Sequence, residues 1–174
     1  MNKITFIFFL LSLTTLSAQD DVFQIARNGT VAEMEQLYKK NPEVIHTQNE
    51  YGYSPFLLAC YNGNAKMVSF LVDKIKDING ISKYGTPLMA AVYKRDEVIV
   101  DILLKNGADV NKGDEGGTTA LHYATLFNNT AIAEKLINAG AKANVKDRSG
   151  KTAFDYATNY KNQKLITLIK SKAL

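Results

Sequence analysis

The hydrophobic and polar positions along this chain repeat with a period of about 33 residues. A short phrase of Ser or Thr, then Pro or Ala, then a large apolar residue occurs four times, with spacings of 32, 33 and 33 residues. A fixed period of this length is typical of a protein built from stacked structural repeats. The four phrases are Ser54-Pro55-Phe56, Thr86-Pro87-Leu88, Thr119-Ala120-Leu121 and Thr152-Ala153-Phe154.

Each phrase predicts the start of one helix, and a second apolar segment follows it. Thr86 is a residue type whose hydroxyl caps free backbone N–H groups, and Pro87 fixes φ in the first helical turn. Gly107 predicts the end of the second helix. No such unit can bury its apolar face alone, so neighbouring units must stack. The second helix is indicated by apolar residues at helical spacing, namely Val98, Ile99, Ile102 and Leu103.

The most complete unit joins Gly85-Thr86-Pro87-Leu88-Met89-Ala90-Ala91 to Ile102-Leu103-Leu104-Lys105-Asn106-Gly107-Ala108-Asp109-Val110-Asn111. This pattern, repeated in the next unit, resembles the ankyrin repeat, and the resemblance covers everything after residue 20. It implies an all-α fold, an ankyrin-repeat solenoid of five helix-turn-helix units with projecting β-turn fingers. The expected domain spans residues 20–174, with units at about 21–50, 51–83, 84–115, 116–148 and 149–174.

One turn between repeats is a residue shorter than the others. Gly85 directly precedes Thr86, whereas the other units place Tyr53, Thr118 or Lys151 before the capping residue. We therefore expect a tighter turn at this point and no break in the stack.

The first eighteen residues have a different pattern from the repeats. Lys3 supplies one positive charge, residues 4–16 form a thirteen-residue apolar run, and small residues end at Ala18. This arrangement is typical of a secretory signal peptide. The alternative is an N-terminal membrane anchor, but the run is well short of the ~20 residues that a spanning helix needs. We expect cleavage of residues 1–18, export to the periplasm or beyond, and no stable membrane insertion afterwards.

The net charge limits the classes of partner that we expect, and the cysteine content limits the disulfides that can form. The formal net charge is +4, and removal of Lys3 with the signal peptide lowers 21 basic side chains to 20 against 17 acidic ones. This excess is too mild to indicate a nucleic-acid partner, so we expect none. The single Cys60 cannot form an internal disulfide. It occupies a small-residue position, where we expect core packing and no reactive thiol.

Candidate chemistry is sparse. The segment 149–152 (Ser-Gly-Lys-Thr) imitates the end of a phosphate-binding loop, but Val145 stands where the first glycine is required. His46 and His122 have no Cys, Asp or Glu at metal-ligand spacing beside them, and no catalytic Ser-His-Asp or Cys-His arrangement is recognisable. The resemblance implies that His122 bonds to loop backbone and holds neighbouring turns together. We predict no catalytic residues, no metal and no cofactor.

Aromatic residues recur at positions that the resemblance places on one side of the stack. In ankyrin domains partners bind the concave side, which is made by the turn tips and the exposed face of each first helix. Exposed Tyr and Phe provide large contact area at small entropy cost. The alternative is that some rings pack only against the next unit. The predicted partner-binding residues are Tyr51, Tyr53, Tyr61, Tyr84, Tyr93, Lys94, Leu126, Phe127 and Tyr160.

The function implied is a non-catalytic, monomeric protein-binding module that acts outside the cytoplasm and holds one protein partner on its aromatic-rich concave face. Small exported bacterial ankyrin proteins support periplasmic catalases and peroxide resistance, and others act as immunity proteins that occupy a toxin; the sequence does not choose between these roles. Two alternatives stay open. One is an effector secreted onward to act on host proteins, and the other is an enzyme or ligand carrier with an unrecognised pocket.

Overall fold

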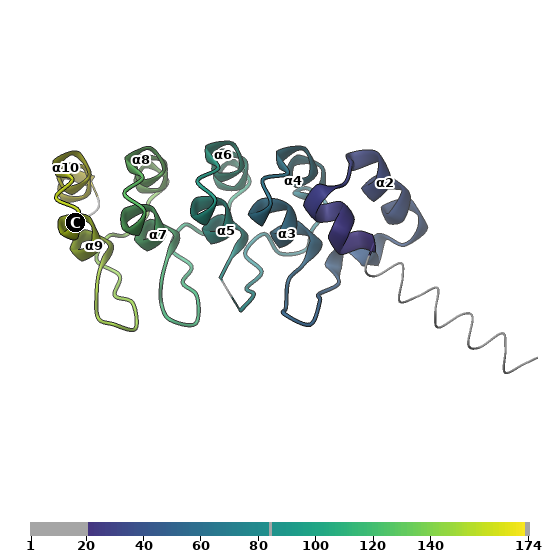
Figure 1. Cartoon of the computed structure of the whole chain (residues 1–174), viewed down its shortest axis with the longest axis horizontal. Coiled ribbons are helices and arrows are strands. Elements are labelled where there is room, and N and C mark those ends of the chain that lie inside the picture. Colours follow the sequence, from purple (N-terminus) through teal and green to yellow (C-terminus); the bar gives the residue numbers. More distant parts are fainter. Residues whose placement is uncertain (1–20, 84, 173–174) are drawn as a thin grey trace, which may run out of the picture.

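Helices alternate between two layers along an elongated stack, and long loops project from the side of the inner layer (Figure 1). The computed structural model describes residues 21–83 and 85–172; the expected signal peptide and Tyr84 lie outside them. A helix at 21–28, α2 (Val31–Lys40) and the 3₁₀ helix η1 (Pro42–His46) form the first unit. The inner helices that follow are α3 (Pro55–Tyr61), α5 (Pro87–Tyr93), α7 (Ala120–Leu126) and α9 (Ala153–Asn159). Their outer partners are α4 (Ala65–Leu71), α6 (Glu97–Lys105), α8 (Thr130–Asn138) and α10 (Gln163–Lys172). The predicted all-α stack of helical hairpins is confirmed.

The same capping chemistry starts the helices of successive units. At α5, the Met89 amide donates to Thr86 Oγ1 at 3.3 Å, and Pro87 occupies the first turn as expected. The outer helices use Asn or Asp caps instead, because a short side-chain oxygen can accept from the amide three residues on. A residue with positive φ precedes each of these outer caps. The pairs are Gly63-Asn64, Arg95-Asp96, Asn128-Asn129 and Lys161-Asn162.

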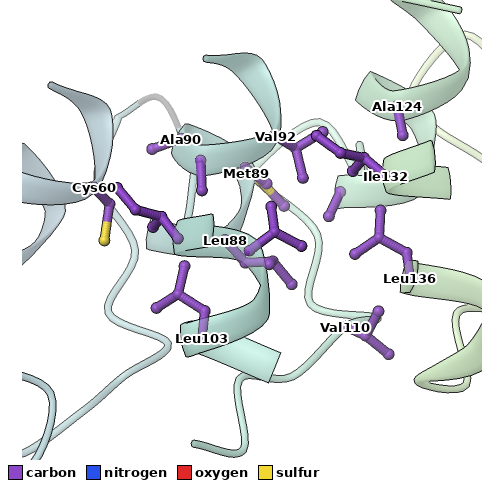
Figure 2. Packing of buried hydrophobic residues seen from close by; sticks show 14 of the residues in the cluster. Cys60, Leu88, Met89, Ala90, Val92, Leu103, Val110, Ala124, Ile132 and Leu136 are labelled. Atoms are coloured by element: carbon purple, nitrogen blue, oxygen red, sulfur yellow. The ribbon is translucent and has the colours of Figure 1, made fainter. Parts of the chain in front are cut away.

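The core is a continuous apolar layer between the inner and outer helices. Each inner helix packs against the next inner helix, and each outer helix packs against the next outer one. Figure 2 shows buried side chains of adjacent units, among them Leu88 and Leu103 of one unit and Leu136 of the next. Leu103 is fully buried, as its register predicts. Cys60 is also fully buried, and burial raises the pKa of its thiol, so its predicted role in core packing is confirmed.

Three of the projecting fingers share one turn. In each, an Asn or Asp side chain accepts hydrogen bonds from the amides two and four residues on, and a glycine with φ between 73° and 75° completes the turn. Only glycine adopts this left-handed conformation without a Cβ penalty. The turns begin at Asn49, Asp114 and Asp147.

The remaining finger is shorter, as the sequence predicts. Ser82 and Gly85 exchange two backbone hydrogen bonds of 3.0 and 3.1 Å, so two residues lie between them where the other fingers have three. The Ser82 hydroxyl also donates to the Gly85 carbonyl at 3.1 Å. The stack is not interrupted at this point, since α3 packs closely against α5.

His122 joins two units. Its Nδ1 accepts from the Thr119 amide at 3.1 Å, which leaves Nε2 to donate to the Lys151 carbonyl in the next finger at 3.3 Å. The side chain is buried and its ring lies edge-on to Tyr156. The predicted structural role of His122 is therefore confirmed.

Replacing His122 with alanine should lower the free energy of unfolding by about 1–3 kcal/mol, because the Thr119 amide and the Lys151 carbonyl both lose their imidazole partner in a buried site. Urea unfolding followed by circular dichroism measures the effect. A change below about 0.5 kcal/mol, the range of an ordinary surface substitution, would show that the imidazole does not hold the fingers together.

Candidate functional site

Three rings from three successive units meet along the inner helices. Tyr61 and Tyr93 stack with ring centroids 5.9 Å apart and planes inclined by 16°. Phe127 meets Tyr93 edge to face at 5.5 Å. We call Tyr61, Tyr93 and Phe127 the aromatic row. Tyr61 is 42 % exposed and Tyr93 is 50 % exposed, so the contacts within the row leave much of both rings open to solvent.

Two cations lie against the aromatic row. Lys94 Nζ is 5.1 Å from the centre of the Tyr61 ring, and the Arg95 guanidinium carbon is 5.7 Å from the centre of the Phe127 ring. Arg95 also donates a hydrogen bond of 3.3 Å to the Phe127 carbonyl of the next unit. Both arrangements are within the range of cation–π attraction. The aromatic row is therefore flanked by two positively charged side chains, Lys94 and Arg95.

A finger contributes a second pair of rings. Tyr51 lies at the tip and Tyr53 at the base of the turn that begins at Asn49, and the centroids of their rings are 6.0 Å apart. Tyr51 is 54 % exposed, whereas Tyr53 is half-buried. The turn fixes the backbone at both residues, because the Asn49 side-chain oxygen accepts from both of their amides at 3.0 Å.

A hollow of about 530 Å³ lies beside the aromatic row, between α3 and α5. We call it the central hollow. Its lining extends from Arg27 of the first unit to Tyr123 of α7. Its volume is in the range of pockets that hold small ligands. The complete lining is Arg27, Tyr53, Leu57, Leu58, Tyr61, Asn62, Ser82, Thr86, Met89, Ala90, Tyr93 and Tyr123.

One residue of the lining is small where later repeats carry tyrosine. Ala90 is four residues after its helix cap, and the equivalent positions of the next two units hold Tyr123 and Tyr156. Ala90 and Ala91 are both buried, but Ala91 is fully enclosed whereas Ala90 also lines the hollow.

The two tyrosines that replace Ala90 tie their fingers to the inner helices. The Tyr156 hydroxyl donates to Asp147 Oδ2 at 2.6 Å, which lowers the pKa of that carboxyl and raises the pKa of the phenol. Burial, followed by the nearby charge of Asp114, raises the pKa of Tyr123. Both phenols are therefore neutral at physiological pH, and both acids have a partner within the protein.

The structure brings some of the predicted partner-binding residues together and leaves others apart. Tyr53, Tyr61 and Tyr93 line one hollow, and Phe127 and Lys94 extend that surface. Leu126 is 37 % exposed and Tyr160 is 50 % exposed, but among the described residues Tyr160 makes no ring contact with the row. Tyr84 lies outside the described residues.

Sequence reasoning missed Tyr123 as part of this surface. Tyr123 lines the central hollow and stacks on Phe127 with ring centroids 6.1 Å apart. Tyr123 and Ala90 both lie four residues after a helix cap. A comparison of these two equivalent positions could have identified Tyr123 as part of the same surface. Met89 was likewise assigned no surface role, although it lines the hollow.

Across residues 21–83 and 85–172, no cluster of three or more His, Cys, Asp or Glu side chains could hold a metal ion. Every buried side-chain nitrogen or oxygen in this part of the chain has a hydrogen-bond partner. None of its helices combines the length and the apolar character that crossing a membrane requires.

Comparisons with known proteins agree with the repeat architecture. A family model described as "Ankyrin repeats (3 copies)" matches residues 22–114, and one described as "Ankyrin repeats (many copies)" matches residues 103–157. The chain is 32 % identical over 111 residues to the rat "Ankyrin repeat and SAM domain-containing protein 6", a match covering 63 % of this chain and 12 % of that protein.

Two further relatives come from a fungus and a bacterium. "Palmitoyltransferase akr1" of Neurospora crassa is 32 % identical over 117 residues, which is 66 % of this chain and 16 % of that protein. A "Putative ankyrin repeat-containing protein" of Treponema pallidum is 30 % identical over 107 residues, 61 % of this chain and 36 % of that protein. In each of these comparisons the match spans 36 % or less of the relative's length.

Proposed function

This chain belongs to the ankyrin-repeat family, whose repeats form protein–protein interaction modules that are generally non-catalytic, and we propose that it binds one protein partner through its concave face. The proposed contact surface is the aromatic row with the adjoining Tyr51, Tyr53, Lys94, Leu126 and Tyr160. Tyr84, which lies outside the described residues, is included from its sequence position. The protein is proposed to act as a monomer.

The exposure of the aromatic row carries this proposal. A ring that serves only to pack one repeat on the next gains most when it is fully buried, as Leu103 and Phe56 are. Tyr61 and Tyr93 instead stack on each other and stay 42 % and 50 % exposed. Rigid, half-open tyrosines with cations beside them have the composition of binding hot spots. The row therefore supports binding beyond internal packing.

Affinity capture tests the proposal. The purified protein, without residues 1–18, is immobilised and exposed to periplasmic extract, with Tyr93→Ala and Lys105→Ala variants treated identically. A partner that is retained by the wild type and Lys105→Ala, and lost with Tyr93→Ala, is the expected result. A partner retained equally by all three would place the binding surface elsewhere on the molecule.

We also propose that residues 1–18 act as a signal peptide and that the protein works in the periplasm or outside the cell. Mass spectrometry of the exported protein should find a mature N-terminus at Gln19 or within a residue or two of it, because small residues follow the apolar run at that point. An exported protein that still carried Met1 to Ala18 would contradict this.

Two finer roles follow from the resemblance to small exported ankyrin proteins. The partner is either a periplasmic stress enzyme such as a catalase, which this protein supports, or a toxin that it occupies. The alternatives are an effector that acts on host proteins, and an enzyme or ligand carrier. The identity of the captured partner separates these roles.

A further inference from the structure

We propose that the central hollow is an insertion pocket, and that it receives one large apolar side chain from an acidic segment of the protein partner. This inference rests on the proposed function and assigns the chemistry of what is bound. It follows from the shape of the hollow, its lining and the charges around it.

The lining favours an apolar or aromatic group. Leu57, Met89 and Ala90 supply apolar surface, while the rings of Tyr61, Tyr93 and Tyr123 surround it. Aromatic rings favour offset-stacked and edge-to-face contacts with another ring, and they also cover aliphatic groups well. Because the rings of Tyr61 and Tyr93 also belong to the aromatic row, the pocket is continuous with the proposed protein-binding surface. That continuity favours a side chain of a bound protein as the occupant.

The charges favour an acidic segment around that side chain. Of the described residues that line the hollow, Arg27 is the one with a charged side chain, and no carboxylate is among them. Arg27 is half-buried and forms no ion pair with the described residues. Lys94, over the Tyr61 ring, adds a second positive charge at the edge. A cation without a partner beside an apolar pocket complements a carboxylate next to an apolar side chain.

One acidic residue, Asp114, interacts with a residue that lines the hollow and accepts hydrogen bonds from its own finger. The Asp114 carboxylate accepts from the amides of Gly116 and Thr118 at 2.8 and 2.9 Å, and its charge acts on the phenol of Tyr123, which lines the pocket. These hydrogen bonds satisfy part of the carboxylate within its own finger. Arg27 in the lining and Lys94 over the Tyr61 ring are therefore the two cations that a carboxylate of the partner segment could pair with.

The Ala90→Tyr substitution tests the pocket with a residue that the fold already accepts. Tyr123 and Tyr156 occupy the equivalent positions of the next two units, so a tyrosine at position 90 should project into the hollow, obstruct it and leave the helical hairpin intact. Ala90→Leu is a second, smaller filling variant. Circular dichroism and urea unfolding establish that each variant is folded, and Lys105→Ala, on the outer helix of the same unit, is the matched control.

The probes are immobilised peptides with one central phenylalanine or serine, flanked on both sides by either glutamates or lysines. We expect the wild type to bind the glutamate-flanked phenylalanine peptide at least about tenfold tighter than the other three classes. Ala90→Tyr and Ala90→Leu should each weaken that binding about tenfold or more, because the side chain can no longer enter. Arg27→Gln should weaken it several-fold, about threefold to tenfold, and reduce its dependence on salt concentration.

Several results would overturn the proposal. These are equal binding of the serine and phenylalanine peptides, preference for lysine flanks, binding of no peptide class, or unchanged binding by both folded filling variants. The proposed function is judged separately with the captured protein partner. If Tyr93→Ala loses that partner while both filling variants keep it, the pocket is not used and the concave face is still the binding surface.

Discussion

Replacing Leu103 with alanine is expected to lower the free energy of unfolding by about 2–5 kcal/mol. Leu103 is fully buried in α6, within the apolar layer that joins its own unit to the next (Figure 2). The truncation removes apolar contacts and leaves a cavity that the surrounding helices fill only partly. Urea unfolding followed by circular dichroism measures the loss.

The cooperativity of unfolding should change as well. In a stacked-repeat protein each unit contacts only its neighbours, so stability is a sum of unit terms and interface terms. A cavity in the middle unit weakens the coupling between the two halves, and the transition of Leu103→Ala should broaden or divide. Lys105, two residues further on, is exposed in the last turn of the same helix. Lys105→Ala should change stability by less than about 0.5 kcal/mol, and equal effects of the two substitutions would contradict the register.

Replacing Tyr93 with alanine should weaken binding of the captured protein partner by about 2 kcal/mol or more, which is roughly thirtyfold in Kd. Tyr93 is the middle ring of the aromatic row, lines the central hollow and contacts both Tyr61 and Phe127. Residues at the centre of an interface carry most of its affinity because the contacts around them exclude water. Isothermal titration with the purified partner measures the change.

The folded state should be much less affected by Tyr93→Ala. The ring is half-exposed, and its two aromatic contacts are of a kind worth about 0.5–1.5 kcal/mol each beyond area burial. We therefore expect the free energy of unfolding to fall by no more than about 2 kcal/mol, with the stack intact. If the variant unfolds, or if its Kd for the partner is unchanged, Tyr93 serves in packing between repeats and not in binding.

Lys105 is a better control for these experiments than another basic residue of the outer helices, Lys135. Lys135 Nζ lies 2.7 Å from Asp101 Oδ2 and 3.7 Å from Glu97 Oε2, so it links α8 to α6. This link between units was not expected from the sequence. Its removal would alter the stack as well as the surface.

Features that depend on a few neighbouring residues were predicted correctly from the sequence. The cap at Thr86, the tighter turn at Gly85 and the burial of Leu103 each follow from local chemistry or from the helical period, and the structure has all three. The repeat supplies the long-range part of such predictions, because each unit packs on the next in the same register. The role of His122 came from the resemblance to the ankyrin repeat, and the hydrogen bonds of its ring confirm it.

The candidate site was predicted less completely because it depends on differences between units. Two residues that line the central hollow differ between units: Ala90 stands where Tyr123 and Tyr156 stand in the next two, and Ser82 belongs to the shorter finger. The repeat register places Leu126 at the position equivalent to Tyr93. The ring that contacts Tyr93, however, is that of the next residue, Phe127. Side-chain direction across units is set by packing in three dimensions, which a period along the chain does not specify.

Site-specific photocrosslinking at position 93 tests the central claim most directly. A photoreactive phenylalanine analogue replaces Tyr93 in one sample and Lys105 in another, and each protein is irradiated in living cells of its native source. A protein-binding concave face predicts a discrete crosslinked protein from position 93 and none from position 105. No crosslinked protein from position 93, or the same product from both positions, would contradict the claim.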